Sequence, residues 1–121
     1  MRQWVIDWVA ALRSGNYEQG KEKLCRNGKY CCLGVLCELH DCVKTDYGQG
    51  IISFNGCISV LPRSLFMIVS IEQNGSFDPA KLDTVVPVNV CTLTRLNDSY
   101  GWTFEQIADL IEEIETKGAW L

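Results

Sequence analysis

The sequence YCCLGVLCELH, from Tyr30 to His40, contains the longest apolar run of the chain, Cys31 to Cys37. Apolar side chains occupy nearly every position, so periodicity does not separate a strand from a helix, but the length of the run favours a buried helix. Gly34 in its middle disfavours that helix by about 1 kcal/mol relative to alanine, and it would allow another backbone segment to approach closely. We therefore expect a buried, cysteine-rich helix.

Amphipathic patterns predict a helix before this run and another near residue 121. The first helix ends near Gly15 and has one apolar stripe, formed by Trp4, Val5, Trp8, Val9 and Leu12. Thr103 and Gln106 predict a capping box at the start of the last helix, and Lys117-Gly118 predicts its end. The apolar stripe of this helix consists of Phe104, Ile107, Ala108, Ile111 and Ile114.

Residues 51–60, with the sequence IISFNGCISV, predict a β-hairpin. Two β-prone runs flank Asn55-Gly56, a dipeptide that tolerates positive φ at both central positions of a type I′ turn. By contrast, the polar residues 15–29 are punctuated by glycines, which is typical of a loop.

Weaker patterns predict three short helical segments in the second half of the chain. Pro62 favours the start of a helix through Val69, although the β-branched end of that segment is also compatible with a strand. Asp78-Pro79 predicts one helical turn, and the apolar pattern over 90–97 predicts a short helix.

Taken together, these patterns predict a compact single domain of the α+β class over residues 1–121. The N-terminal helix, the cysteine-rich helix and the C-terminal helix should surround a small antiparallel sheet that carries the 51–60 hairpin. With 47% hydrophobic residues, the 121-residue chain can form a sizeable core, which excludes a disordered or low-complexity protein. The apolar run from Cys31 to Cys37 is too short to span a bilayer. Asp7 interrupts the apolar stretch from Trp4 to Ala11, which argues against an export signal or a membrane anchor. We therefore expect a cytoplasmic protein.

Seven cysteines are an odd number, which argues against a secreted disulfide scaffold and favours buried, reduced thiols. Cys32, Cys37, His40 and Cys42 lie close in sequence, but their spacing matches no standard zinc motif. His40 is the only histidine, so any Cys/His or Ser/His catalytic device would have to use it. We expect no cofactor, no metal and no enzymatic activity, and a small zinc-binding protein or a Cys37/His40 enzyme remains an alternative.

The charges are unevenly distributed along the chain, whose net charge is −4. This balance disfavours a general nucleic-acid-binding protein, because phosphate binding needs clustered positive charge. Residues 13–29 are locally basic and offer a candidate anion pocket formed by Tyr17, Gln19, Lys21, Lys23, Arg26 and Lys29. Residues 103–121 are locally acidic and offer a candidate partner-binding surface formed by Glu105, Asp109, Glu112, Glu113 and Glu115.

Several short sequence motifs together resemble those of a widespread, largely uncharacterised family of small proteins encoded by tailed phages and prophages. The motifs are Ala11-Leu12-Arg13-Ser14-Gly15, Tyr17 with Gln19-Gly20-Lys21, Tyr30 to Cys37, Leu61-Pro62, Leu96-Asn97-Asp98, and Phe104 with Ile107-Ala108 and Ile111-Glu112. After Lys21 the chain departs from the family, which is usually rich in glycine and arginine there. The resemblance implies an accessory viral role inside a bacterial cell and supplies no catalytic residues.

The leading hypothesis is a non-enzymatic binding protein of phage type that modulates or inhibits a bacterial host protein, such as a defence component. The second hypothesis is a protein that sequesters a phosphorylated or nucleotide-like signal in the basic segment. We expect no membrane partner and no nucleic acid. A homo-oligomer remains open, because Trp4, Trp8, Trp102 and Trp120 could either complete the core or face a second subunit.

Overall fold

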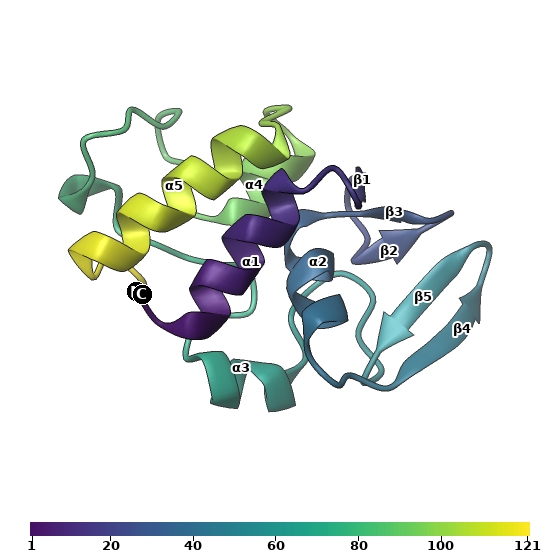
Figure 1. Cartoon of the computed structure of the whole chain (residues 1–121). Coiled ribbons are helices and arrows are strands. Elements are labelled where there is room, and N and C mark those ends of the chain that lie inside the picture. Colours follow the sequence, from purple (N-terminus) through teal and green to yellow (C-terminus); the bar gives the residue numbers. More distant parts are fainter.

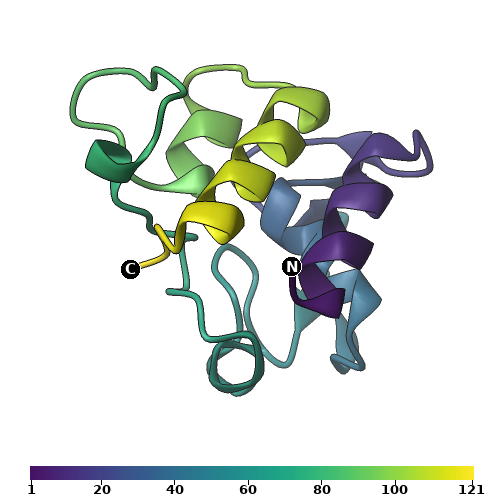
Figure 2. The same cartoon turned by 60° about the vertical axis from the view of Figure 1, so that its left-hand side comes forward.

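Helix α1 (Gln3–Arg13) and helix α5 (Phe104–Lys117) come from opposite ends of the chain and pack against each other. The computed structural model describes residues 1–121. Arg2 contacts Glu115 at one end of the helix pair, and Arg13 contacts Glu105 at the other, so the two helices run antiparallel. Both views show them side by side (Figures 1 and 2).

The local signals at both ends of the chain are confirmed. The predicted stripe of α1 is buried at Val5, Trp8, Val9 and Leu12. Helix α5 begins with the predicted capping box, in which the Thr103 hydroxyl accepts from the Gln106 backbone N–H and the Gln106 side chain accepts from the Thr103 N–H. The helix ends at Gly118, whose φ of 62° lies in the left-handed region that favours glycine.

The cysteine-rich run forms helix α2 (Cys32–Leu39), whose residues Cys32 to Cys37 are all buried. Gly34 permits the close approach expected from the sequence, because a Cβ at this position would lie 2.6 Å from the carbonyl carbon of Leu24. The backbone before β2 therefore crosses directly over α2. Only a residue without a side chain fits between them.

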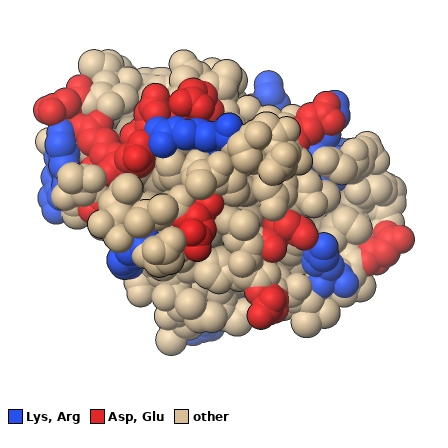
Figure 3. All heavy atoms as spheres, viewed as in Figure 1, with Lys and Arg blue, Asp and Glu red and all other residues tan.

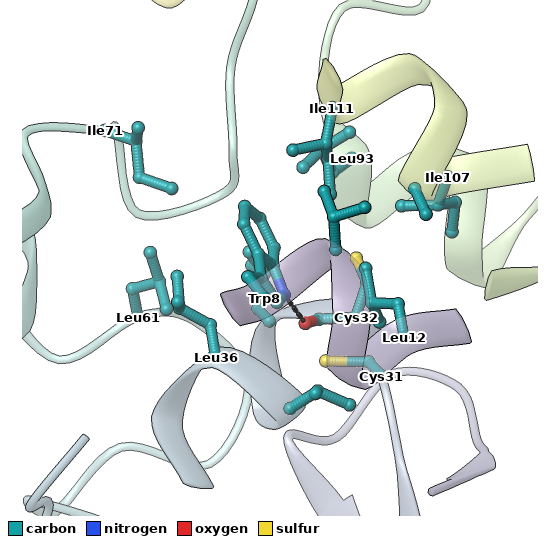
Figure 4. Packing of buried hydrophobic residues seen from close by; sticks show 14 of the residues in the cluster. Trp8, Leu12, Cys31, Cys32, Leu36, Leu61, Ile71, Leu93, Ile107 and Ile111 are labelled. Carbon is teal, nitrogen blue, oxygen red and sulfur yellow. Dashed lines mark hydrogen bonds between the residues drawn. The ribbon is translucent and has the colours of Figure 1, made fainter. Parts of the chain in front are cut away.

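The core forms one cluster of 28 buried hydrophobic residues, with Trp8 near its centre (Figure 4). The Trp8 indole N–H donates to the Cys32 carbonyl oxygen at 2.9 Å, which joins α1 to α2. Trp4 and Trp120 stack on Trp8 at centroid distances of 6.2 and 6.3 Å, and Trp102 packs against the cluster. The four tryptophans thus complete the core.

Three shorter helical segments confirm the weaker predictions for the second half of the chain. They are α3 (Arg63–Val69), the 3₁₀ turn η1 (Pro79–Lys81) and α4 (Leu93–Asp98). The β-branched end of the segment after Pro62 is therefore helical up to Val69, and Ser70 ends α3 with a φ of 58°. Helix α4 contacts both α2 and α5, whereas α3 lies at the edge of the helical body (Figure 1).

The sheet is mixed and has five strands in the order β1-β3-β2-β5-β4. The strands are β1 (Glu18–Gln19), β2 (Cys25–Arg26), β3 (Lys29–Tyr30), β4 (Lys44–Gly48) and β5 (Ile51–Phe54). Strands β1 and β3 are parallel, whereas the other neighbours are antiparallel. The α+β class is confirmed, but the sheet is not entirely antiparallel as expected.

The predicted 51–60 hairpin is wrong, although its turn exists. Asn55 and Gly56 have φ values of 49° and 87°, and Phe54 and Cys57 form a single antiparallel bridge across them. The second run does not continue as a strand, because the Ile58 carbonyl oxygen accepts from the Leu24 N–H instead. Strand β5 pairs with β4, which precedes it in the chain.

Residues 15–29 were expected to form a loop or an irregular excursion, which holds for most of them but misses three short strands. These residues contribute β1 and β2 and the first residue of β3. Asn27 and Gly28, with φ values of 53° and 76°, form the tight turn between β2 and β3. The signal in the sequence was the same Asn-Gly dipeptide that predicted a hairpin at 55–56.

Candidate functional site

The turn between β2 and β3 carries two basic residues directly opposite each other. Arg26 and Lys29 are cross-strand partners in this antiparallel pair. Residues directly opposite in such a pair extend their side chains to the same face of the sheet. Cys25 and Tyr30, the next pair, lie toward the core, while Arg26 and Lys29 are exposed. The turn itself rests on the β4–β5 connection, where the Asn27 N–H donates to the Gly50 carbonyl oxygen at 2.8 Å.

A surface hollow of about 220 Å³ lies beside this turn, and we call it the basic hollow. Its lining has no hydrophobic side chain and no carboxylate, and consists of Gly20, Lys21, Arg26, Asn27 and Lys29. Gly20 is required for this packing, because a Cβ there would lie 2.9 Å from the Lys29 Cβ. The structure therefore brings together three of the six residues predicted for an anion pocket.

The positive charge in the basic hollow is only partly balanced within the chain. Lys29 Nζ lies 3.7 Å from Glu18 Oε1, but no carboxylate lies within ion-pair distance of Lys21 or Arg26. Like charges directly opposite on neighbouring strands destabilise a sheet. An anion between the basic groups would remove this repulsion and supply charge-assisted hydrogen bonds.

The other three predicted pocket residues have different surroundings. Gln19 points into the body and binds α4 and the start of α5, as described below. The Tyr17 ring packs edge-on against the Tyr30 ring at a centroid distance of 5.3 Å. Lys23 Nζ lies 3.5 Å from the Ser59 hydroxyl oxygen. None of these three residues lines the basic hollow.

Asn97 holds the basic hollow in place, a role that the charge clustering in the sequence did not indicate. The side chain is 1% exposed, and its amide N–H groups donate to the Gly20 carbonyl oxygen and to Asp98 Oδ1, both at 2.9 Å. Asp98 Oδ1 also accepts from the Glu22 N–H at 2.9 Å. The α4 amide and carboxylate thereby fix the backbone on both sides of Lys21. The available signal in the sequence for this role was a polar asparagine within an apolar helical pattern.

Three of the five acidic residues predicted as a partner surface gather around one cation. The Arg13 guanidinium contacts Asp109 and Glu112 at 2.5 Å and Glu105 at 3.4 Å. The hydrogen bonds to Glu112 and Asp109 raise the pKa of Arg13 above its ordinary value. Figure 3 shows acidic and basic groups in direct contact over the surface formed by α1 and α5. We call these four residues the Arg13 cluster, in which three carboxylates face one guanidinium.

The remaining two acids serve separate intramolecular contacts. Glu113 accepts from Lys117 Nζ at 2.6 Å and from the Thr84 N–H at 3.1 Å, and the hydrogen bond from Lys117 is the main cause of a pKa of about 2. Glu115 is 8% exposed at its side chain and binds the Arg2 guanidinium at 2.7 Å. This hydrogen bond lowers the Glu115 pKa to about 2. The five acids therefore do not share one exposed face.

Of the two thiols near His40, Cys37 is buried and Cys42 is half-buried. Burial raises the pKa of the Cys37 thiol well above its ordinary value and also raises that of Cys42, which disfavours the reactive thiolate. His40 and Cys42 line a separate hollow of about 330 Å³ together with Asn55, Ser64 and Ile68. The structure groups no three His, Cys, Asp or Glu side chains in positions that could hold a metal ion.

The fold and the surface define a small α+β protein with a basic hollow beside a strand turn. None of its helices has the length and apolar character needed to cross a membrane. The family model described as Domain of unknown function (DUF8296) matches residues 1–115, and the chain belongs to this family. No curated protein and no solved structure matches the chain.

Proposed function

We propose that this chain is a non-enzymatic binding protein that acts in the cytoplasm of a bacterial cell as an accessory protein of a phage. The viral setting is supported by the resemblance of the motifs from Ala11 to Glu112 to those of small proteins of tailed phages and prophages. The non-enzymatic character is supported by the raised pKa of Cys37 and Cys42 beside the only histidine. The basic groups of the hollow, whose charge the fold balances only in part, indicate the ligand.

The basic hollow is the recognition site of this protein, and its ligand is a phosphorylated or nucleotide-like small molecule. The observation that carries this proposal is the cross-strand pairing of Arg26 with Lys29, with Lys21 lining the same hollow. Guanidinium and ammonium groups bind phosphate oxygens through charge-assisted hydrogen bonds. The Asn27 side chain adds a polar group beside the charges. Sequestering such a signal requires binding alone.

A thermal-shift series with inorganic pyrophosphate and a panel of nucleotides tests the proposal, since a ligand that binds only the folded state raises the melting temperature. Arg26→Ala should abolish the shift. Arg63→Ala is the matched control, because it removes the same charge from an exposed position on α3. No shift with any anion, or an equal shift in the Arg26→Ala variant, would overturn the assignment of the hollow.

The Arg13 cluster supports a second candidate, the capture of a bacterial host protein such as a defence component through a basic surface. Arg13 balances only one of the three carboxylates around it, and the side chains of Glu105 and Asp109 are 65% and 67% exposed. Charge complementarity of this kind accelerates association and selects the partner. The candidate surface consists of Glu105, Asp109 and Glu112, without the internally bound Glu113 and Glu115.

A double variant that reverses Glu105 and Asp109 to lysine tests this candidate in a pull-down from bacterial cells. The double variant should lose a specific partner that the wild-type protein retains. Reversing the exposed acids Asp7 and Asp41 is the control with the same change in net charge. If the Glu105/Asp109 variant and the Asp7/Asp41 control retained the partner equally, the Arg13 cluster would not be the surface that recognises it.

A further inference from the structure

Strand β4 forms the free edge of the five-stranded sheet, and all five of its residues are exposed. Figure 1 shows it on the outer side of β5, away from the helices. The Val43 carbonyl oxygen accepts from the Asn55 N–H at 2.8 Å, so Val43 directs its backbone groups toward the β5 side. Because these directions alternate along an antiparallel strand, Lys44 and Asp46 direct their N–H and C=O groups to the open edge.

The residues along this edge are complementary to a second copy of the same sequence. In an antiparallel pairing centred on Thr45, Lys44 of one copy lies opposite Asp46 of the other, and this happens twice by symmetry. The same register places Val43, which is 68% exposed, opposite Tyr47, which is 62% exposed. Opposite charges and aromatic with β-branched side chains are both favourable cross-strand pairs.

From the open backbone and this pattern, we propose that β4 pairs with β4 of a second copy across a two-fold axis at Thr45. The two five-stranded sheets then form one continuous sheet. The register that pairs the charges also matches the backbone, since Lys44 and Asp46 are the residues with outward N–H and C=O groups. This pairing is independent of the basic hollow, which lies at the β2–β3 turn.

Two local features fit this pairing. Lys44 Nζ lies 2.8 Å from Glu38 Oε1 but leaves 53% of its side chain exposed, so it can also contact a carboxylate of the second copy. The β-bulge of β4 falls at Tyr47, between Asp46 and Gly48, so the ladder is regular from Lys44 to Asp46 and the Val43–Tyr47 contact lies at its end. The contact is short, and interfaces of this size are typically weak and reversible.

Sedimentation velocity of the wild-type protein over about a hundredfold range of concentration should show a monomer–dimer equilibrium. Lys44→Glu and Asp46→Lys should each weaken self-association on the order of tenfold or more, because two opposite-charge pairs become two like-charge pairs. An equimolar mixture of the two variants restores opposite charges at both positions and should dimerise like the wild type. Circular dichroism of each variant checks that the fold is retained.

Rescue in the mixture is specific to this register, because a variant that merely misfolds would not regain association from a second damaged variant. A wild-type protein that stays monomeric at every concentration would overturn the proposal. Dimerisation that neither variant weakens, or variants that do not associate when mixed, would equally overturn it. Binding of a segment of another protein along β4, in place of β4 of a second copy, would also contradict the proposal.

Discussion

Gln19 Nε2 donates to Asn97 Oδ1 at 2.8 Å across a sequence separation of 78 residues. The same Gln19 amide donates to the Trp102 carbonyl oxygen at 2.8 Å, and its oxygen accepts from the Phe104 N–H at 3.1 Å. Asn97 Oδ1 also accepts from the Cys32 N–H at 3.3 Å. This pair of amides therefore joins β1, α2, α4 and α5 next to the basic hollow.

Asn97→Ala should destabilise the fold by about 3 kcal/mol, because it leaves the half-buried Gly20 carbonyl and the buried Cys32 N–H without a partner. Chemical denaturation monitored by tryptophan fluorescence measures the change. Asn16→Ala is the control at an exposed asparagine and should stay within about 0.5 kcal/mol of the wild type. Equal stability of the two variants would contradict the structural role of Asn97.

Gly34→Ala should cost about 3 kcal/mol, since the added methyl group overlaps the Leu24 carbonyl where the backbone crosses α2. In an ordinary exposed helix the same change would be stabilising. Gly15→Ala provides the comparison, because nothing lies within 4 Å and only the left-handed φ of 77° costs about 1 kcal/mol. A stable Gly34→Ala variant with a wild-type spectrum would show that the crossing is looser than described.

Glu115→Gln should lower the stability at neutral pH by about 2 kcal/mol, because the Arg2 guanidinium loses its charged partner. The folded pKa of Glu115 is lowered to about 2, so the carboxylate stabilises the fold above its ordinary pKa of 4.5, and this contribution is lost as the pH falls toward 2. The difference between variant and wild type should therefore shrink over that range. Glu105→Gln, at a side chain 65% exposed, serves as the control with little effect at any pH.

The cysteines should react with iodoacetamide in an order set by their burial. Cys91 is exposed and should be labelled first in the native protein at pH 8. Burial raises the pKa of Cys31 to about 12, and Cys32 is fully buried, so both should react at least about a hundredfold more slowly until the protein unfolds. Peptide mass spectrometry over time gives the order. Labelling of Cys32 as fast as Cys91 would refute its place in the core.

Local signals in the sequence predicted the helices well. The capping box at Thr103, the end at Gly118 and the stripes of α1 and α5 depend on residues within a few turns of one another. The strands were harder, because an Asn-Gly dipeptide fixes a turn but not the segments that pair across it. At Asn55-Gly56 the following run leaves the ladder, whereas at Asn27-Gly28 two residues on each side are enough.

The candidate site was also predictable only in part, because it depends on contacts between residues that lie far apart in the sequence. Charge clustering indicated Lys21, Arg26 and Lys29, which the structure places around one hollow. It did not reveal that Gln19 turns inward, because the direction of a polar side chain depends on Asn97, far away in the sequence. Likewise, the run of acids in α5 did not reveal which of them bind Arg2, Arg13 or Lys117.

Titration of the isotope-labelled protein with inorganic pyrophosphate, followed by amide chemical shifts, tests the basic hollow most directly. We expect saturable shifts confined to the amides of Gly20, Lys21 and the turn from Arg26 to Lys29. The affinity obtained from these shifts should fall at least about tenfold in Arg26→Ala, because this variant lacks a charge-assisted contact. Shifts scattered over the surface, or unchanged affinity in that variant, would contradict an anion site at the β2–β3 turn.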